Sequence, residues 1–358
     1  MHVCWIEVID PDKNEPVLVK FNDLIDLNIE QSLYVAADTF DCVLKNDLLL
    51  SDYLRKEQEI SFWLGSTHNL GGWTKNELTH VFTGKIDGVR PRFGREMTVQ
   101  LIGRDFTARF IDTEFSVAFA ERTASDIAIL LAEKHGIPIE VVPTTAIIEK
   151  DLYKDRKEWA ILQELADREG FVCYMKKGKV LYFGPRKDSD DIVVAELYYR
   201  QKDKSNILEI EFDDSMVGVI NHVVVRHWMG RGKRLIEGEA KNQELIDKYG
   251  EKKRVVYDPK AKTEEQAKEI AEKKLKEWSR MVVTADQVRL PCAPYMECEK
   301  MVSVTGCGRF DGKYYIERVR HQYNKSAGWF SECNLTSQRP DSAAQYRQDL
   351  YDYKEQKM

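Results

Sequence analysis

Two strand-rich segments, one toward each end of the chain, constrain the fold more than any other feature of this sequence. In the first, Met97, Val99 and Leu101 alternate with polar residues, and a period of two is typical of a half-buried strand. Strand patterns fill residues 1–115 and return in residues 205–338. A chain of 358 residues is also too long for one ordinary hydrophobic core. We therefore predict a mainly β protein of the α+β class with several domains.

The segment between them, residues 116–204, has a different character. Apolar residues recur at helical spacing from Trp159 to Ala166, and Gly170 supplies the left-handed residue at which helices commonly end. Two short apolar runs follow, with Lys-Lys-Gly at residues 176–178 between them, an order typical of a hairpin. We predict a small α/β insert that contains a helix–strand unit and this helix–hairpin unit.

One long helix is predicted to interrupt the second strand-rich segment. Thr263 and Gln266 form a capping pair, and the apolar stripe that follows them ends at Trp278. The predicted organisation has four parts: a first β domain (1–115), the α/β insert (116–204), a second β domain with the long helix (205–338) and a C-terminal helix or tail (339–358).

Charge and cysteine content exclude several classes of protein. The net charge is −6, and residues 1–115 hold 12 basic against 19 acidic residues, so no segment is basic enough for a dedicated nucleic-acid binder. No apolar run is long enough for a transmembrane helix, and the first residues lack the pattern of a secretory signal. Seven cysteines without a Cys-x-x-Cys pair indicate a reducing compartment.

Histidines and cysteines are the first candidates for a metal site. His222 and His227 are five residues apart on a predicted strand, and an odd spacing places them on opposite faces. Four cysteines in the final third have spacings that match no zinc knuckle: Cys292, Cys298, Cys307 and Cys333. We predict one buried histidine, one exposed histidine and buried thiols, with no metal and no cofactor. Whether the four cysteines bind a metal stays open.

Sequence motifs for catalysis are also missing. Gly306-Cys307-Gly308 and Gly230-Arg231-Gly232 lack the strand–turn–helix context of nucleotide-binding loops and are predicted to be turns. The adjacent carboxylates Asp190-Asp191 and Asp213-Asp214 would point apart on a strand, so neither is a glycosidase pair by itself. The aromatic residues of the predicted strands are expected in a core or an interface: Trp228, Tyr314, Tyr315, Trp329 and Phe330. No catalytic residue is assigned, and the chain is predicted not to be an enzyme.

Several of these segments resemble the phage late control protein D family, the baseplate hub proteins of phage tails and related contractile injection machines. Residues 159–185 resemble the helix–hairpin unit of that family, and residues 98–106 are similar to the strand that closes its first barrel. Residues 310–321 resemble a strand pair near the C-terminal end of that family, and residues 328–335 resemble the strand after it. The resemblance covers most of residues 40–338, in the expected order.

The resemblance implies a fold and a role. Two tail-tube-like β-barrels would flank the α/β insert, and three copies would form a ring with six barrel positions. This homotrimer would adapt the sixfold tail tube to the threefold spike and leave a central channel through which DNA passes. The implied partners are the tail tube protein, the central spike, and the baseplate wedge and tape-measure proteins. The implied location is a virion or a bacteriocin-like particle, made in the bacterial host cytoplasm.

Three alternatives are compatible with the sequence. A tail-associated cell-wall hydrolase would need paired carboxylates, a Cys/His pair or a metal site, and a glycan-binding tail protein would use exposed aromatic residues. A tube or distal tail protein would have a single barrel and sixfold symmetry. The resemblance leaves open whether the particle is an infectious phage or a headless one, whether the tail contracts, which host it has and which residues line the channel.

Overall fold

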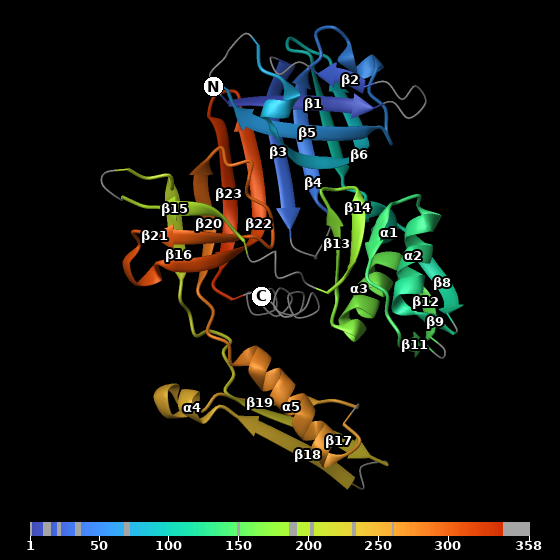
Figure 1. Ribbon diagram of the computed structural model, residues 1–358, viewed down its shortest axis with the longest axis vertical. Helices are drawn as coiled ribbons and strands as arrows, with labels where there is room; N and C mark the ends of the chain where they lie inside the picture. The colour runs from blue at the N-terminus through green and yellow to red at the C-terminus, as the bar shows by residue number, and fades with distance from the viewer. Residues whose placement is uncertain are drawn as a thin grey trace. The chain divides into compact units, whose positions relative to one another are not determined.

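The computed structural model describes residues 2–9, 16–19, 23–32, 37–67, 72–119, 121–148, 151–185, 192–200, 204–230, 234–259 and 261–338. The predicted C-terminal helix or tail, residues 339–358, lies outside this range. The chain forms two compact units, residues 1–212 with 285–358 and residues 213–284 (Figure 1). The four-part domain division stays a prediction.

The first unit is built on one large, mostly antiparallel sheet. Its first half-sheet has the order β3-β4-β7-β6-β5-β1-β2. The strands are β1 (His2–Ile9), β2 (Pro16–Val19), β3 (Leu24–Ser32), β4 (Thr39–Lys45), β5 (Glu59–Ser66), β6 (Thr79–Arg92) and β7 (Thr98–Arg104). The predicted alternation around Val99 and Leu101 is confirmed, since both side chains are fully buried in β7 while their neighbours are half-exposed.

Its second half-sheet has the order β16-β20-β23-β22, with β21 paired to β22 and β15 parallel to β21. The strands are β15 (Val193–Tyr198), β16 (Glu209–Asp213), β20 (Thr284–Pro291), β21 (Met301–Thr305), β22 (Gly312–Asn324) and β23 (Gly328–Thr336). Strand β22 is 13 residues long, and its second part also pairs antiparallel with β3, from Arg318 opposite Ser32 to Asn324 opposite Asp26.

The pairing of β3 with β22 joins both half-sheets into one sheet of 13 strands. The mainly β prediction is therefore confirmed, whereas two barrels are not confirmed by the structure. The physical reason for the continuous sheet is the length of β22, because one edge pairs with β23 while the other pairs with β21 and then β3. Arg320 adds an ion pair with Glu30 across this junction, at 3.1 Å.

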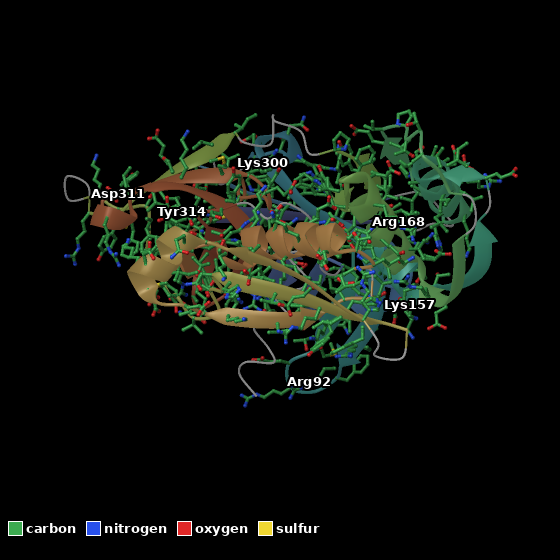
Figure 2. The ribbon with its side chains drawn as sticks, turned by 90° about the horizontal axis from the view of Figure 1, so that it is seen from below. Arg92, Lys157, Arg168, Lys300, Asp311 and Tyr314 are labelled. Atoms are coloured by element: carbon green, nitrogen blue, oxygen red, sulfur yellow. The ribbon has the colours of Figure 1, made fainter. Side chains whose placement is uncertain are left out.

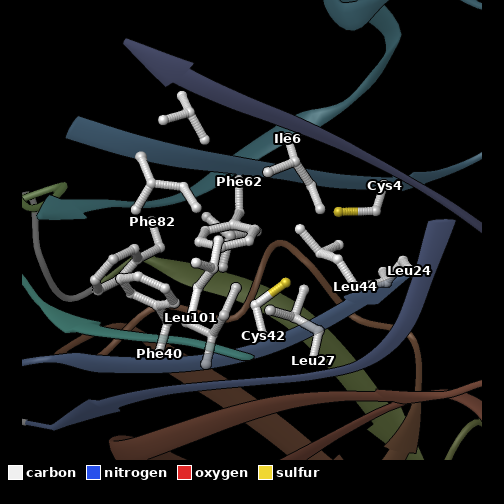
Figure 3. Close-up of a cluster of buried hydrophobic side chains, with 14 of the residues drawn as sticks. Cys4, Ile6, Leu24, Leu27, Phe40, Cys42, Leu44, Phe62, Phe82 and Leu101 are labelled. Atoms are coloured by element: carbon white, nitrogen blue, oxygen red, sulfur yellow. The ribbon is translucent and has the colours of Figure 1, made fainter. Parts of the chain in front are cut away.

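The main core lies against the first half-sheet (Figure 3). The rings of Phe40, Phe62 and Phe82 meet in tilted and edge-on contacts at centroid distances of 5.3–6.2 Å. Cys4 and Cys42 are buried in the same cluster. Aromatic rings bury large apolar areas and favour such offset geometries, so these three rings contribute strongly to the stability of this core.

The insert is a helical layer between short sheets. Its helices are α1 (Thr107–Asp112), α2 (Ala124–Lys134) and α3 (Glu158–Glu169). Its strands are β8 (Glu114–Phe119), β9 (Arg122–Thr123), β10 (Ile139–Val141), β11 (Ile147–Ile148), β12 (Asp151–Lys157), β13 (Val172–Lys176) and β14 (Val180–Gly184). The predicted helix–hairpin is confirmed: α3 ends at Gly170 with φ +68°, and β13 and β14 pair antiparallel.

The second unit is a three-stranded sheet with one helix on it. The order is β18 (Arg234–Lys241), β17 (His222–Met229), β19 (Lys253–Tyr257), followed along the chain by α5 (Glu264–Trp278), and α4 (Gln243–Tyr249) connects β18 to β19. The predicted long helix is confirmed, with Thr263 Oγ1 accepting a hydrogen bond from Gln266 N at 3.2 Å. Ala267 and Ala271 of α5 pack with Val223 and Val225 of the sheet. Within the described residues, no helix combines the length and apolar character that a membrane span requires.

Candidate functional site: the junction at the β13–β14 hairpin

The tip of the β13–β14 hairpin is wedged against the first half-sheet. We call Lys177, Gly178 and Lys179 the lysine tip. Gly178 has φ +80°, and a Cβ atom there would lie 2.0 Å from the carbonyl oxygen of Thr83 in β6. Its own carbonyl oxygen accepts a hydrogen bond from Phe106 N at 3.3 Å. Only glycine combines this backbone angle with this closeness, so the contact depends on that residue.

Two ion pairs connect the lysine tip to both half-sheets. Lys179 Nζ lies 2.8 Å from the carboxylate of Glu59 in β5, and Lys177 Nζ lies 3.7 Å from Glu297, between β20 and β21. Each lysine is at least half-exposed, and pairs in water are worth only about 0.2–1 kcal/mol. The backbone contact of Gly178 therefore positions the hairpin, and the charges add a smaller contribution.

A cavity of about 410 Å³ lies beside this contact, inside the first unit. The first half-sheet, the insert and the second half-sheet all contribute to its wall, through Asp38, His80, Asp105, Trp159, Tyr174 and Cys298 among others. Segments distant in sequence thus meet at one place in the fold. The contacts of the lysine tip lie next to this cavity, so the two half-sheets and the insert are held together beside it.

Two neighbouring carboxyl groups, Asp38 and Asp105, lie at this cavity. Asp105 N donates to the carbonyl oxygen of Asp38 at 2.9 Å, and Ser32 N donates to Asp38 Oδ1 at 3.0 Å. Thr107 donates to Asp105 through its backbone N–H at 3.0 Å and its hydroxyl at 2.9 Å. Burial raises the pKa of Asp38 to about 7, and burial together with the charge of Asp38 raises the pKa of Asp105 well above its ordinary value.

Two further titratable groups of the cavity, His80 and Cys298, also have shifted pKa values. Burial, followed by the charge of Lys177, lowers the pKa of His80, whose Nε2 lies 2.7 Å from Thr83 Oγ1. Burial raises the pKa of the Cys298 thiol well above its usual range, so a reactive thiolate is not favoured. The chemistry that this arrangement supports is proton uptake and release by the carboxyl pair.

The predicted histidine candidates both lie on β17 of the second unit. His222 is buried, and its ring nitrogens contact Glu251 at 2.6 Å and Glu239 at 3.2 Å. His227 is half-buried, opposite Ile236 of β18. Among the residues that the structure describes, no group of three or more His, Cys, Asp or Glu side chains is placed to hold a metal ion.

The four cysteines of the final third differ in exposure. Cys333 is buried, whereas Cys292, Cys298 and Cys307 are half-buried, and all four are free thiols. Burial raises the pKa values of Cys292 and Cys333 to about 12. Buried thiols of this kind behave as small apolar side chains.

The remaining sequence candidates are distributed over the fold. Gly306 lies in a bend directly after β21, with φ +86°, and Gly230 lies in a turn, with φ +62°. Gly308, with φ +69°, begins a short 3-10 helix, Gly308–Phe310, rather than a turn. Asp213 ends β16 and Asp214 follows it, while Arg231, Gly232, Asp190 and Asp191 lie outside the described residues. Tyr314 and Trp329 are buried, Tyr315 and Phe330 are half-buried, and Trp228 is 51% exposed.

Sequence reasoning missed the carboxyl pair and the contact of Gly178 with Thr83. Lys-Lys-Gly signalled a turn, but nothing in it specified the partner strand. Asp105 follows β7 directly and Asp38 precedes β4, and these strands pair antiparallel. An expected pairing of those two strands would have brought both carboxyl groups to the same end of the sheet.

A family model and solved structures match this chain. The model described as Alg8 N-terminal domain matches residues 70–325, and the chain belongs to that family. None of the curated proteins matches it in sequence.

Three solved structures show the same fold. A 43 kDa tail protein of prophage MuSo2 from Shewanella oneidensis has a TM-score of 0.71 and 14% identity, over 95% of this chain and 99% of that chain. The tail protein from Neisseria meningitidis MC58 has a TM-score of 0.69 and 15% identity, over 94% and 96%. The Escherichia coli c3393 protein, a component of the type VI secretion system with structural similarity to T4 bacteriophage tail proteins gp27 and gp5, has a TM-score of 0.55 and 10% identity, over 89% and 75%. The predicted resemblance to phage tail proteins is thus confirmed for the fold.

Proposed function

We propose that this protein is a structural baseplate hub of a phage tail or a phage-tail-like contractile injection particle. The observation that carries the proposal is the similarity to two tail proteins over 94–95% of this chain and 96–99% of theirs. A match over the whole length covers the insert and the pairing that joins both half-sheets. Similarity confined to one domain would cover neither of these features completely. The role is mechanical rather than catalytic.

In this proposal three copies form a ring that adapts the sixfold tail tube to the threefold spike. Each half-sheet, curved into a barrel wall, supplies one of six positions, and the β3–β22 pairing holds two positions together within a chain. The order of the sheet begins at β16 and ends at β2. Strand edges at the ends of a sheet favour association, and a cyclic ring covers them without forming fibres.

The proposed partners follow from this position in the tail. The tube protein contacts one side of the ring, the central spike contacts the other, and wedge and tape-measure proteins join at the periphery and in the channel. DNA passes through without sequence recognition, and the acidic balance of residues 1–115 reduces its adhesion where those residues face the channel.

The number of copies tests this function directly. Mass photometry of the purified chain should give three times 41.6 kDa, about 125 kDa, and negative-stain images should show rings with an open centre. A protein that stays monomeric at micromolar concentration, or that clears peptidoglycan in a turbidity assay, would contradict a purely structural hub.

A further inference from the structure

The β6–β7 hairpin ends in a positively charged tip that no part of the described chain neutralises. We call residues 90–95, Arg-Pro-Arg-Phe-Gly-Arg, the arginine tip. All six residues are exposed, and the ring of Phe93 is 64% exposed. In the part of the chain that the structure describes, the guanidinium groups of Arg90, Arg92 and Arg95 make no ion pair, hydrogen bond or ring contact. In Figure 2 the labelled Arg92 lies at the edge of the first unit.

The turn beside this tip adds a second exposed apolar side chain. Asn46 N donates to the carbonyl oxygen of Met97 at 2.9 Å, which holds residues 46–49 against the base of the hairpin. Leu48 in that turn is 91% exposed. Asp47 and Glu96 are the acidic residues of these two turns, so three arginines outnumber two carboxylates. The end of the hairpin thus combines apolar contact area with unpaired guanidinium groups, a composition enriched at protein interfaces.

A surface of opposite charge lies on the other half-sheet of the same chain. We call residues 209–213, which form β16, the acidic edge. Glu209, Glu211 and Asp213 occupy its exposed face at a spacing of two, and Ile210 and Phe212 face inward. Within the described residues these three carboxylates make no hydrogen bond and no ion pair. Leu208, directly before the strand, is 60% exposed.

The acidic edge is also open for contact along its backbone. β16 pairs with β20 on one side and stands at the end of the strand order in the described sheet. Six strand spacings separate it from β7, about 29 Å along the sheet at the usual ~4.8 Å per strand. Two complementary patches on different parts of one chain favour a head-to-tail contact between copies, which is the contact that closes a ring.

We propose that the arginine tip of one copy docks on the acidic edge of the next copy. This inference rests on the proposed ring and names the surfaces that would close it. Arg90, Arg92 and Arg95 lie opposite Glu209, Glu211 and Asp213, and Phe93 and Leu48 cover Leu208. Guanidinium and carboxylate groups pair with two parallel hydrogen bonds, so the contact sets the register of adjacent copies as well as their affinity.

A charge-swap experiment on the full-length chain tests this contact. One variant carries R90E, R92E and R95E, a second carries E209R, E211R and D213R, and a third carries all six substitutions. Mass photometry across a dilution series gives the dissociation constant of the oligomer for each. Either single set should weaken assembly by at least roughly tenfold because like charges then face each other, and the combined variant should recover most of that loss.

A matched control changes the same charge elsewhere. Lys268, Lys273 and Lys276 lie on the exposed face of α5 in the second unit. A variant that carries K268E, K273E and K276E should assemble like the wild type. Thermal melting of every variant shows that each one folds.

Three outcomes would overturn the proposal in distinguishable ways. Trimers that persist in both single sets would remove the named contact and leave the hub function standing. Loss in both sets without recovery in the combined variant would exclude the acidic edge as the partner of the tip. A wild-type chain that is monomeric at every concentration would overturn both the contact and the proposed function.

Discussion

Two basic hairpin tips in the first unit differ in their surroundings: the lysine tip packs against the chain, and the arginine tip is exposed. The lysine tip, at Gly178, lies against β6 with its lysines paired to Glu59 and Glu297. At the arginine tip, a Cβ added to Gly94 would meet nothing within 4 Å. Similar composition therefore gives two roles: a tip whose partners lie in its own chain stabilises the fold, and a tip without them is available to another molecule.

Replacing the glycine of each tip, Gly178 or Gly94, by alanine should give the largest difference in stability between the two tips. Gly178→Ala places a Cβ 2.0 Å from a carbonyl oxygen at φ +80°, so we expect a loss of about 3 kcal/mol or more. Gly94→Ala should change stability by less than about 0.5 kcal/mol. Differential scanning calorimetry of both variants measures the difference, and equal melting temperatures would show that the lysine tip is not held as described.

The carboxyl pair beside the lysine tip should make stability depend on pH. The pKa of Asp38 is raised to about 7 in the fold, while an unfolded aspartate titrates near pH ~3.9. The folded state then binds more protons between these values, so the stabilisation is complete below pH ~4 and is lost as pH rises through about 7.

Neutral variants should reduce this pH dependence. Asp38→Asn and Asp105→Asn keep acceptor oxygens for Ser32 N and Thr107 N but cannot ionise. Between pH 4 and pH 8 the melting temperature of the wild type should therefore decrease, and that of each variant should decrease by several degrees less. If the melting temperature of the wild type rises steadily over this range, and rises equally in both variants, then the carboxyl pair does not determine the pH dependence of stability.

The ion pair of the lysine tip should contribute less than its glycine. Lys179 and Glu59 are 50% and 21% exposed, so a double-mutant cycle with Lys179→Met and Glu59→Gln should give a coupling of about 0.5–1 kcal/mol. The coupling should shrink in 1 M salt, because added ions screen exposed charges. A coupling energy larger than the stability lost in Gly178→Ala would show that the ion pair, not the glycine, contributes most to holding this tip.

A single charge reversal at the arginine tip should have the smallest effect on stability. Arg92 is exposed and has no partner within the described residues. Arg92→Glu should therefore shift the free energy of unfolding by no more than about 0.5 kcal/mol. Urea unfolding of a dilute, monomeric sample measures this value, and a loss of several kcal/mol would mean that the tip supports its own fold after all.

The sequence predicted those parts of the fold whose signals are local. The apolar spacing from Trp159 to Ala166 and the stop at Gly170 are enough to specify α3 and the start of the hairpin. The join of β3 to β22 could not be predicted, since Ser32 and Arg318 are far apart in the chain and many strand pairings satisfy the same alternation. The two barrels were implied by the family resemblance, and the structure, which has one continuous sheet, does not confirm them.

The candidate site was harder to predict than the fold. Asp38 and Asp105 are ordinary in composition, and their raised pKa values arise from burial that only the assembled sheet provides. The exposure of Arg90, Arg92 and Arg95 is likewise a property of a hairpin that extends beyond its neighbours, not of its residues alone.

A three-dimensional reconstruction of the purified oligomer by electron microscopy would show whether three chains form the proposed ring. Three chains should form a ring with six wall positions around an open channel, alternating between first and second half-sheets. A ring with three wall positions, a closed disc, or a particle built from isolated monomers would contradict it.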